Sequence, residues 1–384
     1  MTSRMCLLVM LGMVACTPRD LALDPVSLAE ATEFAHRFAA AALNCDPAKL
    51  DALVNEDVIA ETIVEQSHAF GASLTTDKLV SNRVGASDVC AATETALAYD
   101  VLRVRLVNGE PRAVLRRIVM PSRWGGGDGV AYDELRLGKS RRDHQIRMVD
   151  MHFYTTGMSL TDAESELGNA VYEAAPGLDG YRFVSKIADA RRLHDAGQSV
   201  AALAELETLP STVRDTRAIA MMRVADASAI SDEAKAKVLD DIARLFPGDP
   251  TIAMMEIDGA ILHGKYDAAL RYVDTADRVV GGDPYWDAIR ASILIKRNAP
   301  GDLDRARDLD DAATRAVPEI AKPWEVRIDV AVARRDWPSA VQAIDRLYSG
   351  FYVVLNEDKL RASPGNYGEM LDSAEYASWR AQHP

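Results

Sequence analysis

Three polar side chains that alternate along one predicted strand are the best candidates for chemistry in this 384-residue chain. Asp150, His152 and Tyr154 are spaced two residues apart, so in a strand they project from one face of the sheet, while Met151 and Phe153 project from the other. A carboxylate beside an imidazole can act as a general acid–base pair if water is excluded. The pattern therefore indicates a candidate small-molecule or hydrolytic pocket. The alternative is a polar strand face that is simply solvated or hydrogen-bonded.

Other catalytic signatures are missing from the sequence. The segment Leu137–Ser140 reads like the end of a phosphate-binding loop, but Asp133 occupies the place of its first glycine. The glycines at 125–127 lack the spacing of a dinucleotide fingerprint. The remaining histidines have no metal-ligand spacing, and neither Gly-x-Ser-x-Gly nor His-Glu-x-x-His occurs. We therefore expect no cofactor and no metal, and we predict a protein that is not an enzyme.

The charge of the chain argues against one class of partner. The formal net charge is −14, from 58 acidic and 44 basic side chains. Such a surface repels phosphate backbones, and no basic stripe offsets it, so we expect no nucleic-acid partner. Beyond the N-terminal region, no stretch reaches the ~20 apolar residues that cross a bilayer.

The first residues have the pattern of a bacterial export signal. Arg4 precedes an apolar run from Met5 to Ala15, which is the length of a signal-peptide core. The run ends in Met13-Val14-Ala15-Cys16, which resembles the lipobox of bacterial lipoproteins. The resemblance implies that residues 1–15 are removed, that Cys16 is lipidated, and that acyl chains anchor the protein in the cell envelope. Thr17 then implies the outer membrane, facing the periplasm. A buried apolar helix or an ordinary secretory signal is the alternative.

Two cysteines remain once Cys16 is acylated. Cys45 and Cys90 would lie in an oxidising compartment, where an even pair favours a disulfide. The alternative is two independent buried thiols.

The period of the apolar residues predicts an α+β domain over residues 27–158, after a tether over 16–26. Helical spacing covers 27–44 and 48–68, and strand-like alternation follows, with a hairpin at Asn108-Gly109. We predict an antiparallel four-stranded sheet from strands near 102–106, 112–120, 130–137 and 146–154. The element order and the blocks Tyr132–Leu135 and Val149–Tyr154 resemble the nuclear transport factor 2-like superfamily. That resemblance implies a cone-shaped domain, and some members line a pocket with an Asp or His base.

The second half of the chain shows an internal repeat. Gly248-Asp249-Pro250 recurs 34 residues later as Gly282-Asp283-Pro284, and Pro318 lies another 34 residues on. A second marker begins at predicted helix–helix turns, each followed five residues later by an alanine that lets the two helices approach closely: Gly197 with Ala202, Gly264 with Ala269, Gly301 with Ala306, and Arg335 with Ala340. This spacing resembles tetratricopeptide repeats (TPRs).

The TPR resemblance implies an all-α solenoid of helix pairs over residues 183–350. A linking helix would cover 159–182, and a capping segment would cover 351–384. A degenerate pair without the glycine is expected over 217–249, and Asp310 lies where an apolar residue is usual. The segments Val279–Tyr285 and Ser373–Trp379 resemble bacterial TPR lipoproteins of undefined function that carry a nuclear transport factor 2-like domain. A non-repeating helical bundle is the alternative.

The repeat phase also predicts a groove lined by the first helix of each pair. Such a groove favours a peptide with basic and aliphatic side chains. We therefore predict a non-enzymatic adaptor that binds an envelope protein, whose identity the sequence does not specify. The alternative is that the groove positions are merely solvated. The residues assigned to the groove are Ile187, Arg191, His194, Met254, Asp258, Ile261, Ser292, Ile295, Glu325 and Asp329.

Overall fold

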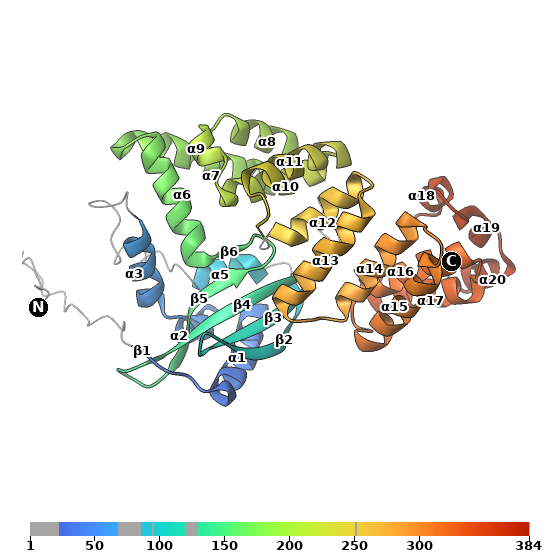
Figure 1. The fold of residues 1–384 in the computed structure, drawn as a ribbon, viewed down its shortest axis with the longest axis horizontal. Coiled ribbons are helices and arrows are strands. Elements are labelled where there is room, and N and C mark those ends of the chain that lie inside the picture. Colours follow the sequence, from blue (N-terminus) through green and yellow to red (C-terminus); the bar gives the residue numbers. More distant parts are fainter. Residues whose placement is uncertain (1–22, 68–85, 94–95, 120–128, 250–251, 384) are drawn as a thin grey trace, which may run out of the picture.

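The computed structural model describes residues 23–67, 86–93, 96–119, 129–249 and 252–383 (Figure 1). An antiparallel sheet with several helices forms the N-terminal part, and a long run of helices forms the rest. The predicted signal peptide, the lipidation site at Cys16 and most of the tether lie outside the described residues.

The sheet has six strands, so the prediction of four strands was wrong. Its order is β2-β3-β4-β5-β6, with β1 pairing on β4. Two strands of two residues each account for the difference, since so short a segment has no detectable alternation: β1 lies in the predicted tether, and β6 follows the last predicted strand. The strands are β1 (Leu23–Asp24), β2 (Ala96–Val107), β3 (Glu110–Val119), β4 (Gly129–Ser140), β5 (Ile146–Phe153) and β6 (Met158–Ser159).

The predicted hairpin between β2 and β3 is confirmed. Asn108 and Gly109 have φ values of 51° and 83°. Two successive positive φ values match the twist of the flanking strands, and Asn-Gly tolerates them best.

Four helices pack on one face of this sheet: α1 (Leu28–Leu43), α2 (Pro47–Leu53), α3 (Glu56–Gln66) and α5 (Ala86–Thr93). Ser27 caps α1 through a capping box with Glu30. The single helix predicted over 48–68 is wrong: it breaks at Val54 and Asn55. Val54 bridges to Met148 of β5, and the Asn55 side chain caps α3. This break depends on a tertiary contact, which helical spacing alone does not reveal.

The core between these helices and the sheet is mostly apolar, and it also holds the buried ion pair of Asp133 with Arg117. Phe34 and Phe38 of α1 meet Leu115, Leu135 and Met151 of the sheet, and none of these side chains is exposed. A disulfide between Cys45 and Cys90 joins the end of α1 to α5, with their Cα atoms 5.0 Å apart. The helix-facing side of the sheet is therefore filled by side chains.

The rest of the chain is helical. After α6 (Leu160–Ala174), five pairs of helices follow in sequence, with each helix contacting the next member of its pair. Short helices connect the first two pairs and end the chain. The pairs are α7 (Tyr181–Asp195) with α8 (Ser199–Glu207), α10 (Arg217–Ile230) with α11 (Asp232–Leu245), α12 (Ala253–Leu262) with α13 (Tyr266–Val280), α14 (Tyr285–Arg297) with α15 (Asp302–Ala316), and α16 (Ala321–Arg334) with α17 (Trp337–Phe351). The short helices are α9 (Ser211–Arg214), α18 (Glu357–Ala362), α19 (Tyr367–Leu371) and α20 (Ala374–Gln382).

The four predicted turn positions all adopt the left-handed backbone conformation. Gly197, Gly264 and Gly301 have φ values of 71°, 68° and 83°, and Arg335 has 59° without being glycine. The alanine five residues after each turn is fully buried in every case. The degenerate pair over 217–249 corresponds to α10 and α11. Ser231 ends one helix and caps the other with extended backbone, so this turn needs no glycine.

The second face of the sheet packs against the helical half, and α12 and α13 lie across it in Figure 1. Val114 and Tyr132 of the sheet join Val273 and Trp286 in one buried cluster. The rings of Tyr132 and Trp286 stack with centroids 5.7 Å apart. Helices therefore cover both faces of the sheet.

Candidate functional site

The three side chains predicted to share one strand face do line one recess. Asp150 and His152 of β5, with Tyr154 just beyond it, border a recess of about 410 Å³ beside the start of α6. The register explains this arrangement, because His152 lies opposite Glu134 of β4 and both side chains project to the same side. Met151 projects to the other side, into the core beneath α1.

The carboxylate of Asp150 accepts hydrogen bonds that hold the first turn of α6 against β5. Its carboxylate accepts hydrogen bonds from the Thr161 hydroxyl at 3.0 Å and from the Thr161 backbone N–H at 3.3 Å. The backbone N–H of Met151 also donates to it, at 2.9 Å. Among the described contacts none joins Asp150 to His152, so these two groups do not form an acid–base pair in this structure.

His152 faces the recess with its ring against Tyr154. The two ring centroids are 5.0 Å apart in an edge-on arrangement. Burial lowers the pKa of His152, so its imidazole is neutral at pH 7. The Tyr154 hydroxyl donates to Glu134 at 2.9 Å, and Arg105 donates to the same carboxylate at 2.8 Å. The wall of the recess is thus polar and largely satisfied by its own hydrogen bonds.

The remaining motif candidate in this region is structural. Leu137–Ser140 forms the end of strand β4. A phosphate-binding loop would instead lead into a helix, so the structure agrees with the rejection of that motif from the sequence. Asp133 is fully buried and pairs with Arg117 at 2.5 Å.

The residues that the sequence analysis assigned to the groove lie in several different environments. On α7, Ile187 and Arg191 line a largely apolar recess of about 530 Å³ against α6. His194 contacts the buried carboxylate of Asp226 on α10 at 2.8 Å. Met254 and Ile261 of α12 pack against the buried cluster that includes the sheet.

A second subset of the groove residues gathers on α12, α14 and α16. Burial is the largest cause of the raised pKa of the Tyr285 hydroxyl, and the charges of Asp258 and Glu325 add to it. Asp329 accepts a hydrogen bond from Tyr367 at 2.5 Å, and burial raises its pKa. Ser292 and Ile295 are half-buried on α14, which lies between α12 and α16 in the order of the first helices of the pairs. We give the name carboxylate face to the surface formed by Asp258, Ser292, Ile295, Glu325 and Asp329.

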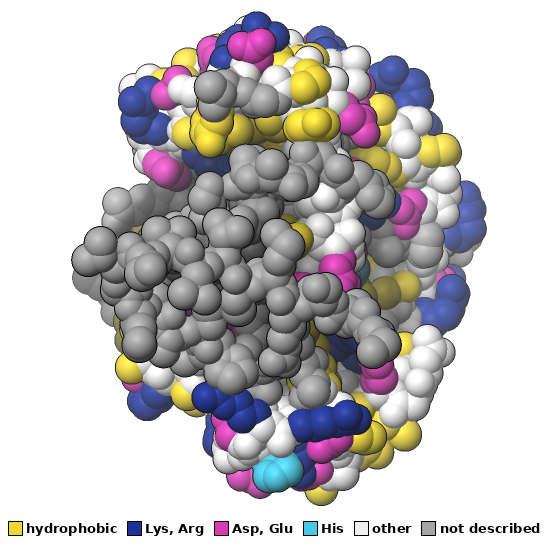
Figure 2. All heavy atoms as spheres, turned by 90° about the vertical axis from the view of Figure 1, so that its left-hand side faces the viewer, with side chains coloured by type: hydrophobic (Ala, Val, Ile, Leu, Met, Phe, Trp, Pro, Cys, Tyr) yellow, Lys and Arg dark blue, Asp and Glu magenta, His cyan; other side chains and the backbone are white. Residues whose placement is uncertain are grey.

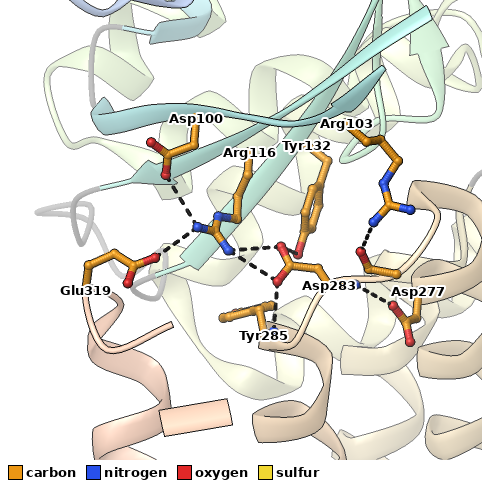
Figure 3. A network of polar contacts seen from close by, with 9 residues as sticks. Asp100, Arg103, Arg116, Tyr132, Asp277, Asp283, Tyr285 and Glu319 are labelled. Atoms are coloured by element: carbon orange, nitrogen blue, oxygen red, sulfur yellow. Dashed lines mark hydrogen bonds and ion pairs between the residues drawn. The ribbon is translucent and has the colours of Figure 1, made fainter. Parts of the chain in front are cut away.

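The loop Val279–Tyr285 has a role that the sequence did not reveal. It connects α13 to α14 and docks on the sheet, where Asp283 meets Arg116 of β3 (Figure 3). Both carboxylate oxygens of Asp283 lie 3.3 Å from the Arg116 guanidinium, and the Tyr132 hydroxyl donates to it at 3.0 Å. The Asp283 side chain is fully buried, and 9% of the Arg116 side chain is exposed. Burial, followed by Asp283, raises the pKa of Tyr132 well above its ordinary value.

Two further arginines of β2 bind the backbone of the same loop. Arg103 donates to the carbonyls of Gly281 and Gly282, and Arg105 donates to the carbonyl of Val279 at 3.1 Å. Gly281 has a φ of 88°, and a Cβ there would lie 2.8 Å from the Arg103 guanidinium. The loop therefore needs glycine both for its conformation and for this close approach.

The neighbouring loops of the 34-residue period also carry acidic side chains that pair with arginines. Glu319, directly after Pro318, accepts a hydrogen bond from Arg116 at 3.0 Å. One period before Asp283, Asp249 pairs with Arg217, which also donates to the carbonyl of Gly157 at the β5–β6 turn at 3.0 Å. Two successive loops thus bind the sheet directly, and the loop before them is linked to the β5–β6 turn through Arg217. A recurrence of Gly-Asp-Pro together with outward arginines on β2 and β3 is the signal from which this docking could have been suspected.

The exposed surface mixes charges of both signs. Over the described part of the face in Figure 2, Lys and Arg side chains lie beside Asp and Glu. Arg192 with Asp189 at 2.8 Å and Arg141 with Asp24 at 2.7 Å are examples of such pairs.

Comparisons of the chain with family models, with curated proteins and with solved structures found no match. Within the part of the chain that the structure describes, no helix has the length and apolar character to cross a membrane. The same residues contain no cluster of three or more His, Cys, Asp or Glu side chains arranged to hold a metal ion.

Proposed function

We propose that this protein is a non-enzymatic adaptor of the bacterial cell envelope, anchored by lipid at Cys16 in the outer membrane and facing the periplasm. Its helical half acts as a TPR-type solenoid, and the carboxylate face binds a segment of an envelope protein. The observation that carries the proposal is that Asp258 of α12 and Glu325 of α16, on the first helices of two different pairs, both keep exposed carboxylate surface and each pair with a lysine.

The order of the helices supports a solenoid. Each turn of the predicted phase has a positive φ, and each following alanine is buried where two helices cross. Neighbouring pairs also contact each other, as α13 does α14 and α14 does α16. Stacking of this kind buries apolar faces that no single pair can bury alone.

The side on which the sheet docks supports the choice of surface. The sheet engages the loops that connect one pair to the next, at Asp283 and Glu319. The carboxylate face retains exposed acid groups, since 52% of the Asp258 side chain and 31% of the Glu325 side chain are exposed. This face is therefore open to a partner while the sheet is in place.

The present contacts of these acids indicate what the partner offers. Asp258 pairs with Lys235 at 2.5 Å, and Glu325 pairs with Lys322 at 2.9 Å. Ion pairs this exposed contribute about 0–1 kcal/mol, so an incoming cation can replace either lysine at little cost. We therefore infer a partner segment that presents Lys or Arg side chains next to aliphatic ones.

Capture of partners from detergent-solubilised envelopes tests the proposal. The full chain is required, because removing the helical half would expose the buried face of the sheet. Three baits are compared: the wild type, a double variant with Asp258→Lys and Glu325→Lys, and the control Asp308→Lys. Asp308 suits the control because it is 69% exposed and lies on α15, which carries none of the residues of the carboxylate face. We expect the partner to be lost with the double variant and kept with the control. Equal capture by all three baits, with unchanged circular dichroism, would exclude this face.

The recess at His152 supports a second candidate, a small-molecule site in the N-terminal domain. The observation in its favour is that Asp150, His152 and Tyr154 line one recess of about 410 Å³. Because Asp150 is bonded to Thr161 instead of His152, the arrangement fits ligand binding better than hydrolysis. Fragment screening by NMR, with His152→Phe as the reference protein, tests it. Fragments that bind the wild type and His152→Phe equally would place the ligand elsewhere.

A further inference from the structure

A recess of about 540 Å³ between α8, α9, α10 and α11 is more basic than the molecule around it. Its lining contains four cationic side chains, which are Arg214, Arg223, Lys237 and Arg244, and three carboxylates. The local balance is one positive charge, whereas the chain as a whole carries −14. An anion that approaches this protein therefore finds here a site of opposite sign to the average surface.

Arg223 is the fixed element of the recess. Only 4% of its side chain is exposed, and two carboxylates from different helices hold it. Its Nε donates to Glu207 of α8 at 2.9 Å, and one of its terminal nitrogens donates to Asp241 of α11 at 3.0 Å. A guanidinium held in this way is pre-organised, because its rotamer is already fixed before any ligand arrives.

The other three cations are more exposed than Arg223. Arg244 shares Asp241 with Arg223, and 75% of its side chain is exposed. Arg214 pairs only with its neighbour Asp215, at 2.9 Å, and is 30% exposed. Lys237 is exposed, and among the described contacts its ammonium group has no partner. These three cations and Arg223 thus line one recess that a compact anion can enter.

Apolar side chains line the recess next to these charges, namely Leu203, Val238 and Leu245. We propose that the recess binds the phosphate group of a small phosphate monoester, with an apolar part of the ligand lying on these side chains. A dianionic phosphate offers three oxygens to guanidinium forks and an ammonium group, and it competes with the resident carboxylates better than a singly charged carboxylate does. The proposal uses none of the residues of the carboxylate face or of the sheet–helix contact, so it stands independently of the proposed function.

Isothermal titration calorimetry on the full chain tests the proposal, with butyl phosphate and inorganic phosphate as two probes in a buffer of constant ionic strength. The variant combines Lys237→Met with Arg244→Gln, and Lys359→Met, an exposed lysine on α18, is the control. We expect butyl phosphate to bind the wild type and the control alike, and to bind the variant at least about tenfold more weakly, as the loss of charge-assisted hydrogen bonds implies.

The two probes separate the sources of the phosphate. Tighter binding of butyl phosphate than of inorganic phosphate supports a phosphate monoester whose apolar part contacts the recess. Equal binding of both probes supports a site for the phosphate group alone and contradicts the proposed apolar contact. Failure of both probes to bind at millimolar concentration would overturn the proposal. Unchanged affinity in the double variant would overturn it as well.

Discussion

Arg116 carries a positive charge into the contact between sheet and helices, where water is nearly excluded. An isolated charge in such a place costs several kcal/mol, and the cost is offset only by close partners. Three carboxylates supply this compensation, with Asp283 fully buried and Asp100 and Glu319 half-exposed. Removing the buried partner therefore affects this site more than removing either exposed one.

Gly281 allows a test of the close approach of Arg103. Gly281→Ala should destabilise the protein more than Gly248→Ala does, by about 1 kcal/mol or more in urea unfolding. Both glycines have positive φ, so both variants carry about 1–2 kcal/mol of backbone strain. Only Gly281 would bring a Cβ within 2.8 Å of Arg103, while nothing lies within 4 Å at Gly248.

A second substitution separates the two contributions. In an Arg103→Met background, the penalty of Gly281→Ala should fall to the level of Gly248→Ala, because no guanidinium then needs to move. If the two penalties already agree in the wild-type background, the contact contributes nothing.

Asp310 is a buried acid of α15, and its burial makes the stability of the protein depend on pH. Burial, only partly offset by Arg327 at 2.9 Å, raises the pKa of Asp310 to about 6. The folded protein therefore holds this proton more tightly than the unfolded chain does. The contribution is favourable below about pH 4 and is lost as the pH rises through 6.

Asp310→Asn mimics the protonated acid and removes this dependence. The stability of the variant relative to wild type should therefore increase between pH 4 and pH 7, by about 3 kcal/mol for a shift of about two pKa units. Urea unfolding at fixed ionic strength across that range measures it. A difference that stays constant with pH, or shrinks toward pH 7, would show that the pKa of Asp310 is not raised.

At the scale of elements, the sequence predicts what depends on local chemistry. The Asn108-Gly109 hairpin follows from two residues that tolerate positive φ. Arg335 adopts the same conformation although its type gives no hint, and only the repeat phase located it. The break at Val54, by contrast, depends on a bridge to Met148, which lies far along the chain. Helical spacing on its own extends the helix through that point.

The candidate sites likewise include residues that local sequence spacing predicts and residues that only tertiary contacts bring together. Alternation along β5 places His152 and Tyr154 in one recess, because two-residue spacing fixes the face of a strand. The partner of Arg116 could not be found like this, since Asp283 is 167 residues away and its contact depends on how two modules meet. The sequence singled out the segment Val279–Tyr285 by its resemblance and by its place in the 34-residue repeat. Its docking role follows only from the structure.

The disulfide is the covalent link between two elements, α1 and α5. Replacing both Cys45 and Cys90 by alanine should lower the free energy of unfolding by about 4 kcal/mol, because the bond closes a loop spanning 45 residues. Urea unfolding with and without reductant measures this. Reduction should destabilise the wild type and leave the double variant unchanged. Equal stability of all four samples would mean that the bond does not constrain the unfolded chain.

At the scale of the whole molecule, the 34-residue period sets how the two halves meet. Asp249, Asp283 and Glu319 lie at successive inter-pair loops and all contact arginines at or next to the sheet. The repeat therefore supplies acidic loops, two of which bind Arg116 of the sheet. The third binds Arg217 of α10, which in turn donates to the carbonyl of Gly157. These contacts join the two halves into one unit.

Hydrogen exchange in the Asp283→Ala variant tests most directly whether the inter-pair loops hold the sheet to the helices. Asp308→Ala is the control. Asp283 holds Arg116, Tyr132 and its own loop together, so its loss should speed exchange in β3 and β4 and in α13 and α14 together. The amides of α20, far from the contact in Figure 1, should keep their wild-type protection. Faster exchange confined to residues 281–285, with β3 and β4 unchanged, would contradict the claim that these loops hold the sheet to the helices.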